Sequence, residues 1–278
     1  MKFALCNEVL GDRELADQCE YAAALGYGGL ELAPYTLDEL PHQMTADKRR
    51  DIRRTIEASG LVVSGLHWLL VIPQDLSITS ADVDVRAKTR QVMCSLVTLC
   101  ADLGGAVLVH GSPKQRWLPD DAADAATARG WAFEAFAQAA VEAEACGVTY
   151  CIEALAPPHA NFITTVAEAA TVVDEIGSPA LRTMIDLGAA RANPAEAPVE
   201  ELIAQWLPSG HIAHIQLRDR SRRGPGQGDD TFAGPLDALA RHRYQGWLAV
   251  EPIELTPDGP ATAAFCAGYV KGLIERQR

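Results

Sequence analysis

Short apolar segments alternate along this chain with longer segments in which apolar residues recur every three or four positions. The short segments are typical of buried β-strands, and the longer ones of helices with one buried face. We expect strands at residues 2–7, 30–34, 61–67, 106–110, 148–153, 181–186, 212–217 and 247–251. We expect helices at residues 14–25, 45–58, 83–103, 122–146, 165–176, 196–206, 235–243 and 261–278, with Thr45 and Thr165 as N-caps.

Regular alternation of strand and helix predicts a parallel sheet joined by right-handed crossovers. Eight such units close most simply into a (β/α)8 barrel, the TIM-barrel architecture, and we expect one domain over residues 1–278. The alternative is an open, doubly wound sheet. That fold needs a glycine-rich phosphate turn after its first strand, and the segment Val9-Leu10-Gly11-Asp12 does not supply one.

Composition narrows the class of protein. The formal net charge of −13 argues against nucleic acid as a partner, because such partners attract basic surfaces. The seven cysteines are scattered without a C-x-x-C pair, as expected for buried thiols in a reducing compartment. No signal peptide and no membrane span are expected, so we predict a cytoplasmic protein. The apolar segment 68–78 suggests a lid or a subunit contact, and we expect a homo-oligomer, either dimer or tetramer.

Polar residues stand at or near the end of seven of the expected strands, 30 to 43 residues apart. In a parallel barrel these ends meet at one mouth, where active sites are built. Clustered carboxylates repel one another, and a divalent cation would offset that repulsion. Carboxylates with an amide oxygen suit Mn²⁺ or Mg²⁺ better than zinc. The strand-end residues are Glu31, His67, His110, Glu153, Asp186, His214 with Gln216, and Glu251.

Several of these residues lie in short motifs that resemble the xylose-isomerase-like sugar isomerase and epimerase superfamily. The motifs are IEA at 152–154, MID at 184–186, HIQLRD at 214–219, RRGPGQG at 222–228 and VEP at 250–252. The resemblance runs through the whole chain in order, and the stretch from His214 to Gly228 is its most specific part. The superfamily includes ketose 3-epimerases, hydroxypyruvate isomerases, inosose dehydratases and zinc endonucleases of base-excision repair.

The resemblance implies one divalent ion, Mn²⁺ or Mg²⁺, held by Glu153, Asp186, Gln216 and Glu251. Gln216 matches the glutamine of hydroxypyruvate isomerases rather than the histidine of ketose 3-epimerases. The substrate-binding arginine of the epimerases falls on Arg222. Their histidine three residues past the strand-6 aspartate is replaced here by Ala189, which puts a simple ketose-epimerase substrate pose in doubt.

These residues suit proton transfer at a carbon next to a carbonyl, with Glu153 and Glu251 as acid and base and the cation stabilising an enediolate. We therefore expect a sugar isomerase or epimerase with a small carbohydrate as substrate. The alternatives are a keto-polyol dehydratase of the same superfamily, a metal-dependent DNA-repair endonuclease, and a non-catalytic sugar-binding module. The endonuclease is disfavoured by the negative charge and by a total of only 7 histidines.

Three histidines and one arginine near the mouth have further predicted roles. We expect His67 and His110 to touch the substrate because each ends a strand. We expect His214, two residues before Gln216 on the same strand face, to orient a ligand without touching the ion. The Gly/Pro spacing of the basic loop aims Arg222 at a substrate hydroxyl, carboxylate or phosphate.

Overall fold

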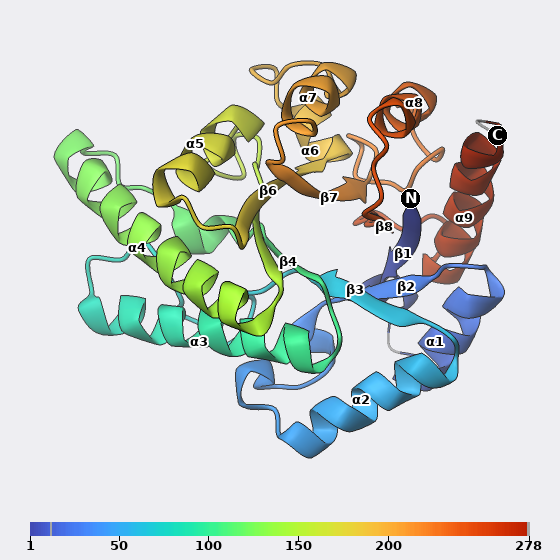
Figure 1. The fold of residues 1–278 in the computed structure, drawn as a ribbon, viewed down its shortest axis with the longest axis horizontal. Helices are drawn as coiled ribbons and strands as arrows, with labels where there is room; N and C mark the ends of the chain where they lie inside the picture. Colours follow the sequence, from blue (N-terminus) through green and yellow to red (C-terminus); the bar gives the residue numbers. More distant parts are fainter. Residues whose placement is uncertain (12, 277–278) are drawn as a thin grey trace.

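The computed structural model describes residues 1–11 and 13–276 of the chain. Eight parallel strands pair in sequence order and close on themselves, β8 lying beside β1 (Figure 1). This confirms the (β/α)8 barrel and excludes the open sheet. The strands are β1 Lys2–Cys6, β2 Gly29–Leu32, β3 Val62–Leu66, β4 Val107–His110, β5 Thr149–Ile152, β6 Leu181–Asp186, β7 Ile212–Leu217 and β8 Trp247–Val250.

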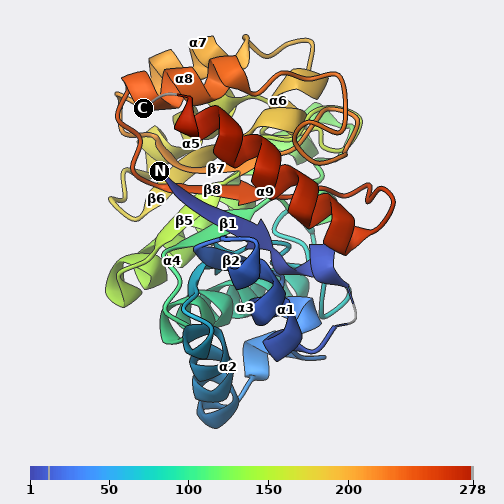
Figure 2. The ribbon, with the colours of Figure 1, turned by 90° about the vertical axis from the view of Figure 1, so that its right-hand side faces the viewer.

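Helices surround the barrel on its outer side, and α9 lies across β1 and β8 where the ring closes (Figures 1 and 2). They are α1 Leu15–Ala24, α2 Ala46–Ala58, α3 Val83–Asp102, α4 Ala122–Cys146, α5 Val166–Ile176, α6 Leu187–Ala192, α7 Val199–Trp206, α8 Ala233–Arg241 and α9 Gly259–Glu275. The short helix α6 was not predicted, and the helix expected from residue 196 begins three residues later. The last two residues of the helix expected to reach 278 lie outside the described residues.

Local capping explains where several helices begin and end. The Thr45 hydroxyl accepts a hydrogen bond from the Lys48 amide, and the Thr165 hydroxyl accepts one from the Glu168 amide. Both caps satisfy amides that the first helical turn leaves free. Helix α4 ends at Gly147, whose φ of 69° is the left-handed conformation that glycine adopts without strain.

The hydrophobic core lies mainly between the barrel and its helices. A smaller cluster of Val107, Val109, Cys151 and Met184 belongs to β4, β5 and β6. Because successive side chains of a strand point to opposite faces, β4 directs Val109 into the barrel and its neighbours Leu108 and His110 toward the helices. This alternation decides which strand-end residues reach the mouth.

The apolar segment 68–78 is built into the molecule. Leu69, Leu70, Leu76 and Ile78 are buried in the main core, and the Ile78 amide donates to the carbonyl of Gln115. Internal packing thus accounts for the apolar character of the segment without a lid or a subunit contact. The expected oligomer stays a prediction.

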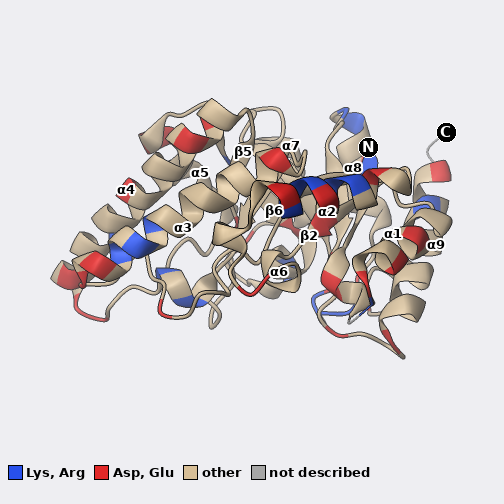
Figure 3. Cartoon of the chain, turned by 90° about the horizontal axis from the view of Figure 1, so that it is seen from below, with Lys and Arg blue, Asp and Glu red and all other residues tan. Residues whose placement is uncertain are grey.

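Other sequence-based expectations concern the surface and the thiols. None of the helices in the described part of the chain is long and apolar enough to span a bilayer. All seven cysteines are free thiols, and Cys94 and Cys146 are the two that are half-buried rather than buried. Seen from below, basic residues are interspersed with acidic ones along the helices (Figure 3).

Candidate active site

A cavity opens at the carboxyl ends of the strands, where the polar strand-end residues were expected to meet. Its walls combine carboxylates, cations and an amide with a few apolar side chains. The lining residues are His67, Trp68, Val109, Gly111, Ser112, Pro113, Glu153, Leu155, His159, Gln216, Arg218, Arg222, Glu251 and Ile253. Five of the eight residues that the sequence assigned to the site therefore line it.

Three carboxylates gather at this end of the barrel. Glu153 follows β5, Asp186 ends β6 and Glu251 follows β8, and all three are buried. Burial, and then the charges of Glu251 and Asp186, raise the pKa of Glu153 well above its ordinary value. Burial also raises the pKa of Glu251. The charges of Asp186 and Glu251 thus oppose ionisation of Glu153, which is the repulsion that a bound cation would relieve.

Arg218, just past β7, supplies positive charge within this cluster. Its guanidinium is hydrogen-bonded and ion-paired to Asp186, and its Nε lies 3.6 Å from Glu251 Oε2. The three carboxylates do not form a group whose ligand atoms all lie within 4.8 Å; in the described residues that spacing is met by Cys6, Glu31 and His67 and by Glu8, His67 and Glu251. A divalent ion bound by Asp186 and Glu251 would therefore share these carboxylates with Arg218 or displace it.

Gln216 provides the observation that best fits a metal. Its Nε2 donates to Glu31 Oε1 at 2.7 Å, whereas its Oε1 is buried without a hydrogen-bond partner among the described residues. A buried amide oxygen without a partner is unfavourable unless a donor or a cation meets it. Because this oxygen lies with Glu153 and Glu251 at one cavity, the donor set fits a hard divalent cation.

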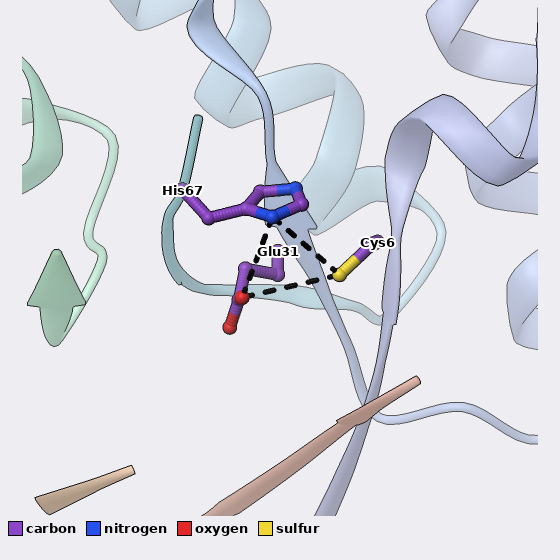
Figure 4. A group of neighbouring side chains, drawn as sticks. All are labelled: Cys6, Glu31 and His67. Carbon is purple, nitrogen blue, oxygen red and sulfur yellow. Dashed lines mark hydrogen bonds and ion pairs between the residues drawn. The ribbon is translucent and has the colours of Figure 1, made fainter. Parts of the chain in front are cut away.

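His67 lies in the cavity wall, as expected from its place after β3. Its Nε2 is 3.0 Å from Glu8 Oε2, and its Nδ1 is 3.3 Å from Glu251 Oε1. Figure 4 shows the ring beside Cys6 and Glu31, whose Sγ and Oε1 lie 4.0 and 3.9 Å from Nδ1. His67 thus contacts one of the candidate acid/base residues, and its predicted contact with substrate stays a prediction.

Glu31 is the main residue of the site that received no role from the sequence. It is fully buried on β2 and contacts both polar residues of β7: Gln216, and His214, whose Nε2 lies 2.6 Å from Glu31 Oε2. Burial opposes ionisation of Glu31, but the charge and hydrogen bond of His214, the charge of His67 and the hydrogen bond of Gln216 together outweigh burial and lower the pKa of Glu31 to about 2. His214 therefore reaches Gln216 through Glu31 rather than directly.

His110 does not line the cavity. Its Nδ1 lies 2.7 Å from the Tyr150 hydroxyl, and its ring packs edge-on against Phe136 of α4. The prediction of a substrate contact finds no support in this placement, because the odd-even alternation of β4 turns Val109 inward and His110 outward. The contacts of His110 with Tyr150 and Phe136 give it a packing role between the barrel and α4.

This placement of His110 predicts a pH dependence of stability. Burial and the nearby charge of Arg116 lower its pKa to about 3, whereas the unfolded chain takes up the proton near its ordinary pKa of about 6.5. The stability that the fold gains from keeping His110 neutral is fully present above pH ~6.5 and is lost as the pH falls toward ~3. Between pH 8 and pH 5 the free energy of unfolding should fall by about 2 kcal/mol through this residue. When unfolding by urea is measured at pH 8 and pH 5, the free energy of unfolding of His110→Asn is expected to change less than that of the wild type, by about 2 kcal/mol.

The activity of the same variant separates the two roles of His110. With a packing role, kcat/KM of His110→Asn at pH 7 stays close to that of the wild type. A tenfold loss of kcat/KM, with an unchanged pH dependence of unfolding, would instead restore the predicted substrate contact.

Four further residues near the site were missed. Trp68, Ser112 and His159 line the cavity from loops, and Ser112 has a left-handed backbone with φ of 40°. Arg116 is fully buried and donates to the backbone carbonyl of Glu153 at 2.7 Å, which fixes the end of β5. Only proximity to strand ends could have suggested them, because loop conformation decides where their side chains point.

Arg222 projects from a loop that its own backbone holds in place. Its φ is 70°, its amide donates to the Asp219 carbonyl, and its carbonyl accepts from the amides of Ile253 and Glu254, each at 2.8 Å. The side chain lines the cavity and has no hydrogen bond or ion pair to another described residue. A strained backbone that presents an unpaired guanidinium to a cavity is typical of a ligand-binding position.

Comparison with known proteins identifies the family of the chain and several relatives. A model of the family described as Xylose isomerase-like TIM barrel matches residues 19–265. An L-ribulose 3-epimerase from Mesorhizobium japonicum is 29% identical over 192 residues, which are 67% of this chain and 61% of that protein. A D-psicose 3-epimerase from Ruminiclostridium cellulolyticum is 25% identical over 236 residues, 84% of this chain and 76% of that protein.

Solved structures show the fold. A D-psicose 3-epimerase crystallised in the presence of D-fructose superposes with a TM-score of 0.81 at 18% identity and 98% coverage of each chain. The apo 3-keto-D-glucoside 4-epimerase YcjR from E. coli gives a TM-score of 0.80 at 18% identity and 99% coverage of each chain.

Proposed function

The chain belongs to the xylose isomerase-like TIM barrel family, and we propose that within it the protein is a divalent-metal-dependent epimerase or isomerase of a ketose. The oxygen of Gln216, which has no partner among the described residues and lies at the cavity that Glu153 and Glu251 also line, is the observation on which the proposal rests. The names of the relatives, which are ketose 3-epimerases, support the substrate class.

Glu153, Asp186, Gln216 and Glu251 would hold the cation, with Mn²⁺ or Mg²⁺ favoured by the all-oxygen set. When bound, such an ion acts as a Lewis acid that lowers the energy of negative charge developing on a carbonyl oxygen. Asp186 accepts hydrogen bonds from the amides of Gly188 and Ala189 through Oδ1, which fixes its carboxylate at the start of α6.

Glu153 and Glu251 are the proposed acid/base pair. They follow β5 and β8, so they approach the cavity from different sides of the ring. One carboxylate removes a proton from the carbon next to the carbonyl, and the other returns a proton to that carbon or its neighbour. Return to the opposite face of the same carbon is epimerisation, and return to the neighbouring carbon is isomerisation.

Arg222 and His67 would bind the substrate. The unpaired guanidinium of Arg222 can donate two parallel hydrogen bonds to hydroxyl or anionic oxygens at the mouth. His67 is held between Glu8 and Glu251, so its ring can fix the orientation of the Glu251 carboxylate while facing the cavity.

The proposal is tested by incubating the Mn²⁺-loaded protein with a panel of ketoses in D₂O. Deuterium entering at a single carbon, with unchanged substrate mass apart from the label, is the expected result, and the labelled position names the reaction. Protein treated with a chelator should catalyse no exchange until Mn²⁺ is restored. A product lighter by one water would identify a dehydratase, and absence of exchange across the panel would contradict the proposal.

A further inference from the structure

Glu31 and His214 form a buried polar pair beneath the site. Both side chains are fully buried, and they come from β2 and β7, which are not adjacent in the ring. His214 Nε2 lies 2.6 Å from Glu31 Oε2, and this contact leaves the other oxygen, Oε1, to face Gln216. Figure 4 shows Glu31 beside Cys6 and His67, whose Sγ and Nδ1 each lie 3.9 Å from its Oε1.

The orientation of the Gln216 amide depends on this carboxylate. An ionised carboxylate only accepts hydrogen bonds, and an amide has one accepting oxygen and one donating nitrogen. With Glu31 Oε1 2.7 Å from the amide, the nitrogen must face Glu31 and the oxygen must face away from it. A rotation of the amide by half a turn would set two acceptors against each other and turn an NH₂ group toward the carboxylates of the cavity.

We propose that Glu31, fixed by His214, is a positioning residue that selects the amide rotamer of Gln216 and so presents its oxygen to a divalent cation. The inference rests on the proposed function, because only a bound cation gives that oxygen a partner. Oxygen ligands of metals are commonly oriented by such outer contacts, whose loss costs about 10- to 100-fold in metal affinity.

The test measures Mn²⁺ affinity by titration calorimetry of protein freed of metal, and so needs no activity assay. Glu31→Gln is expected to weaken Mn²⁺ binding by about 10- to 100-fold, because a neutral amide at this position tolerates either rotamer of Gln216. The exchanged pair Glu31→Gln/Gln216→Glu again sets one donor against one acceptor. We expect it to bind Mn²⁺ more tightly than either single variant.

The single variant Gln216→Glu distinguishes two explanations for the role of Glu31: orientation of the side chain at position 216, and the negative charge that Glu31 adds near the cation. It places two carboxylates face to face, so the positioning role predicts weaker Mn²⁺ binding than in the exchanged pair. If charge alone mattered, Gln216→Glu would bind at least as tightly, since it retains the negative charge of Glu31. This comparison decides the matter even if Glu31→Gln fails to fold.

Ser64→Ala is the matched structural control. The Ser64 hydroxyl is buried on β3 and donates to the Leu30 carbonyl of β2 at 3.0 Å, next to Glu31 but without contact to Gln216. It should lower the thermal unfolding midpoint without changing the Mn²⁺ affinity. Wild-type affinity in Glu31→Gln would overturn the positioning role alone, whereas a wild-type chain that binds no Mn²⁺ would overturn the proposed function and this inference together.

Discussion

Glu153→Gln is expected to lower kcat about 10³-fold while the protein stays folded. The amide keeps the size of the side chain and one oxygen for a cation, but it cannot accept the proton of the substrate, and positioned acid/base groups contribute about 10²- to 10⁴-fold. Removing a buried carboxylate whose pKa is raised should not destabilise the metal-free protein at neutral pH, because the folded state no longer opposes that charge. Steady-state kinetics with the ketose identified by the exchange experiment measure the effect.

The control for this substitution is Glu254→Gln. Glu254 lies three residues past Glu251, and its side chain is exposed and does not line the cavity. The same chemical change there should leave kcat within twofold of the wild type. Near wild-type turnover in Glu153→Gln, with Mn²⁺ still bound, would remove Glu153 from the acid/base pair, and the sugar-binding module would become the better account of the cavity.

Arg222→Ala is expected to lower kcat/KM about 10²-fold, because charge-assisted hydrogen bonds to substrate contribute about 1.5 to 3 kcal/mol each. Alanine retains a Cβ, so the left-handed backbone at this position is as strained in the variant as in the wild type. Arg222→Lys keeps the charge but loses the planar donor pair, and an intermediate loss is expected. Kinetics on the same ketose measure both variants.

Arg223→Ala provides the comparison for Arg222. Arg223 is the next residue of the loop, is exposed, and does not line the cavity. Its replacement should leave kcat/KM unchanged. Equal effects at the two positions would mean that the general charge of the loop, and not a directed contact from Arg222, binds the substrate.

Most of the fold could be predicted from the sequence because its elements have strong local signals. The helix Ala122–Cys146 has the predicted bounds, since Asp121 caps its start and Gly147 adopts the left-handed conformation that ends it. Helix α6 was missed because it spans only six residues and follows β6 without a loop, with Asp186 serving both as the last residue of the strand and as the N-cap of the helix. Short segments carry too few apolar repeats to show a helical period.

The site was partly predictable for a related reason. Strand ends repeat at similar intervals along the chain, so the sequence alone places Glu153, Gln216 and Glu251 at one mouth of the barrel. His110 shows the limit of this reasoning, because a strand end fixes the height of a residue in the barrel but not the face to which it points. On β4, Val109 lines the cavity, whereas the next residue, His110, packs in the core against α4.

Periodicity and capping are local properties, so the sequence by itself determined the eight alternating units, their order in a closed barrel, and the meeting of Glu153, Gln216 and Glu251 at one mouth. Only the tertiary structure decided that Glu31 meets His214 and Gln216, that Arg218 pairs with Asp186, and that Arg222 lines the cavity from a left-handed backbone position. These contacts join residues from different strands and loops. Their geometry depends on how the ring closes and how its interior packs, which no local pattern of residues specifies.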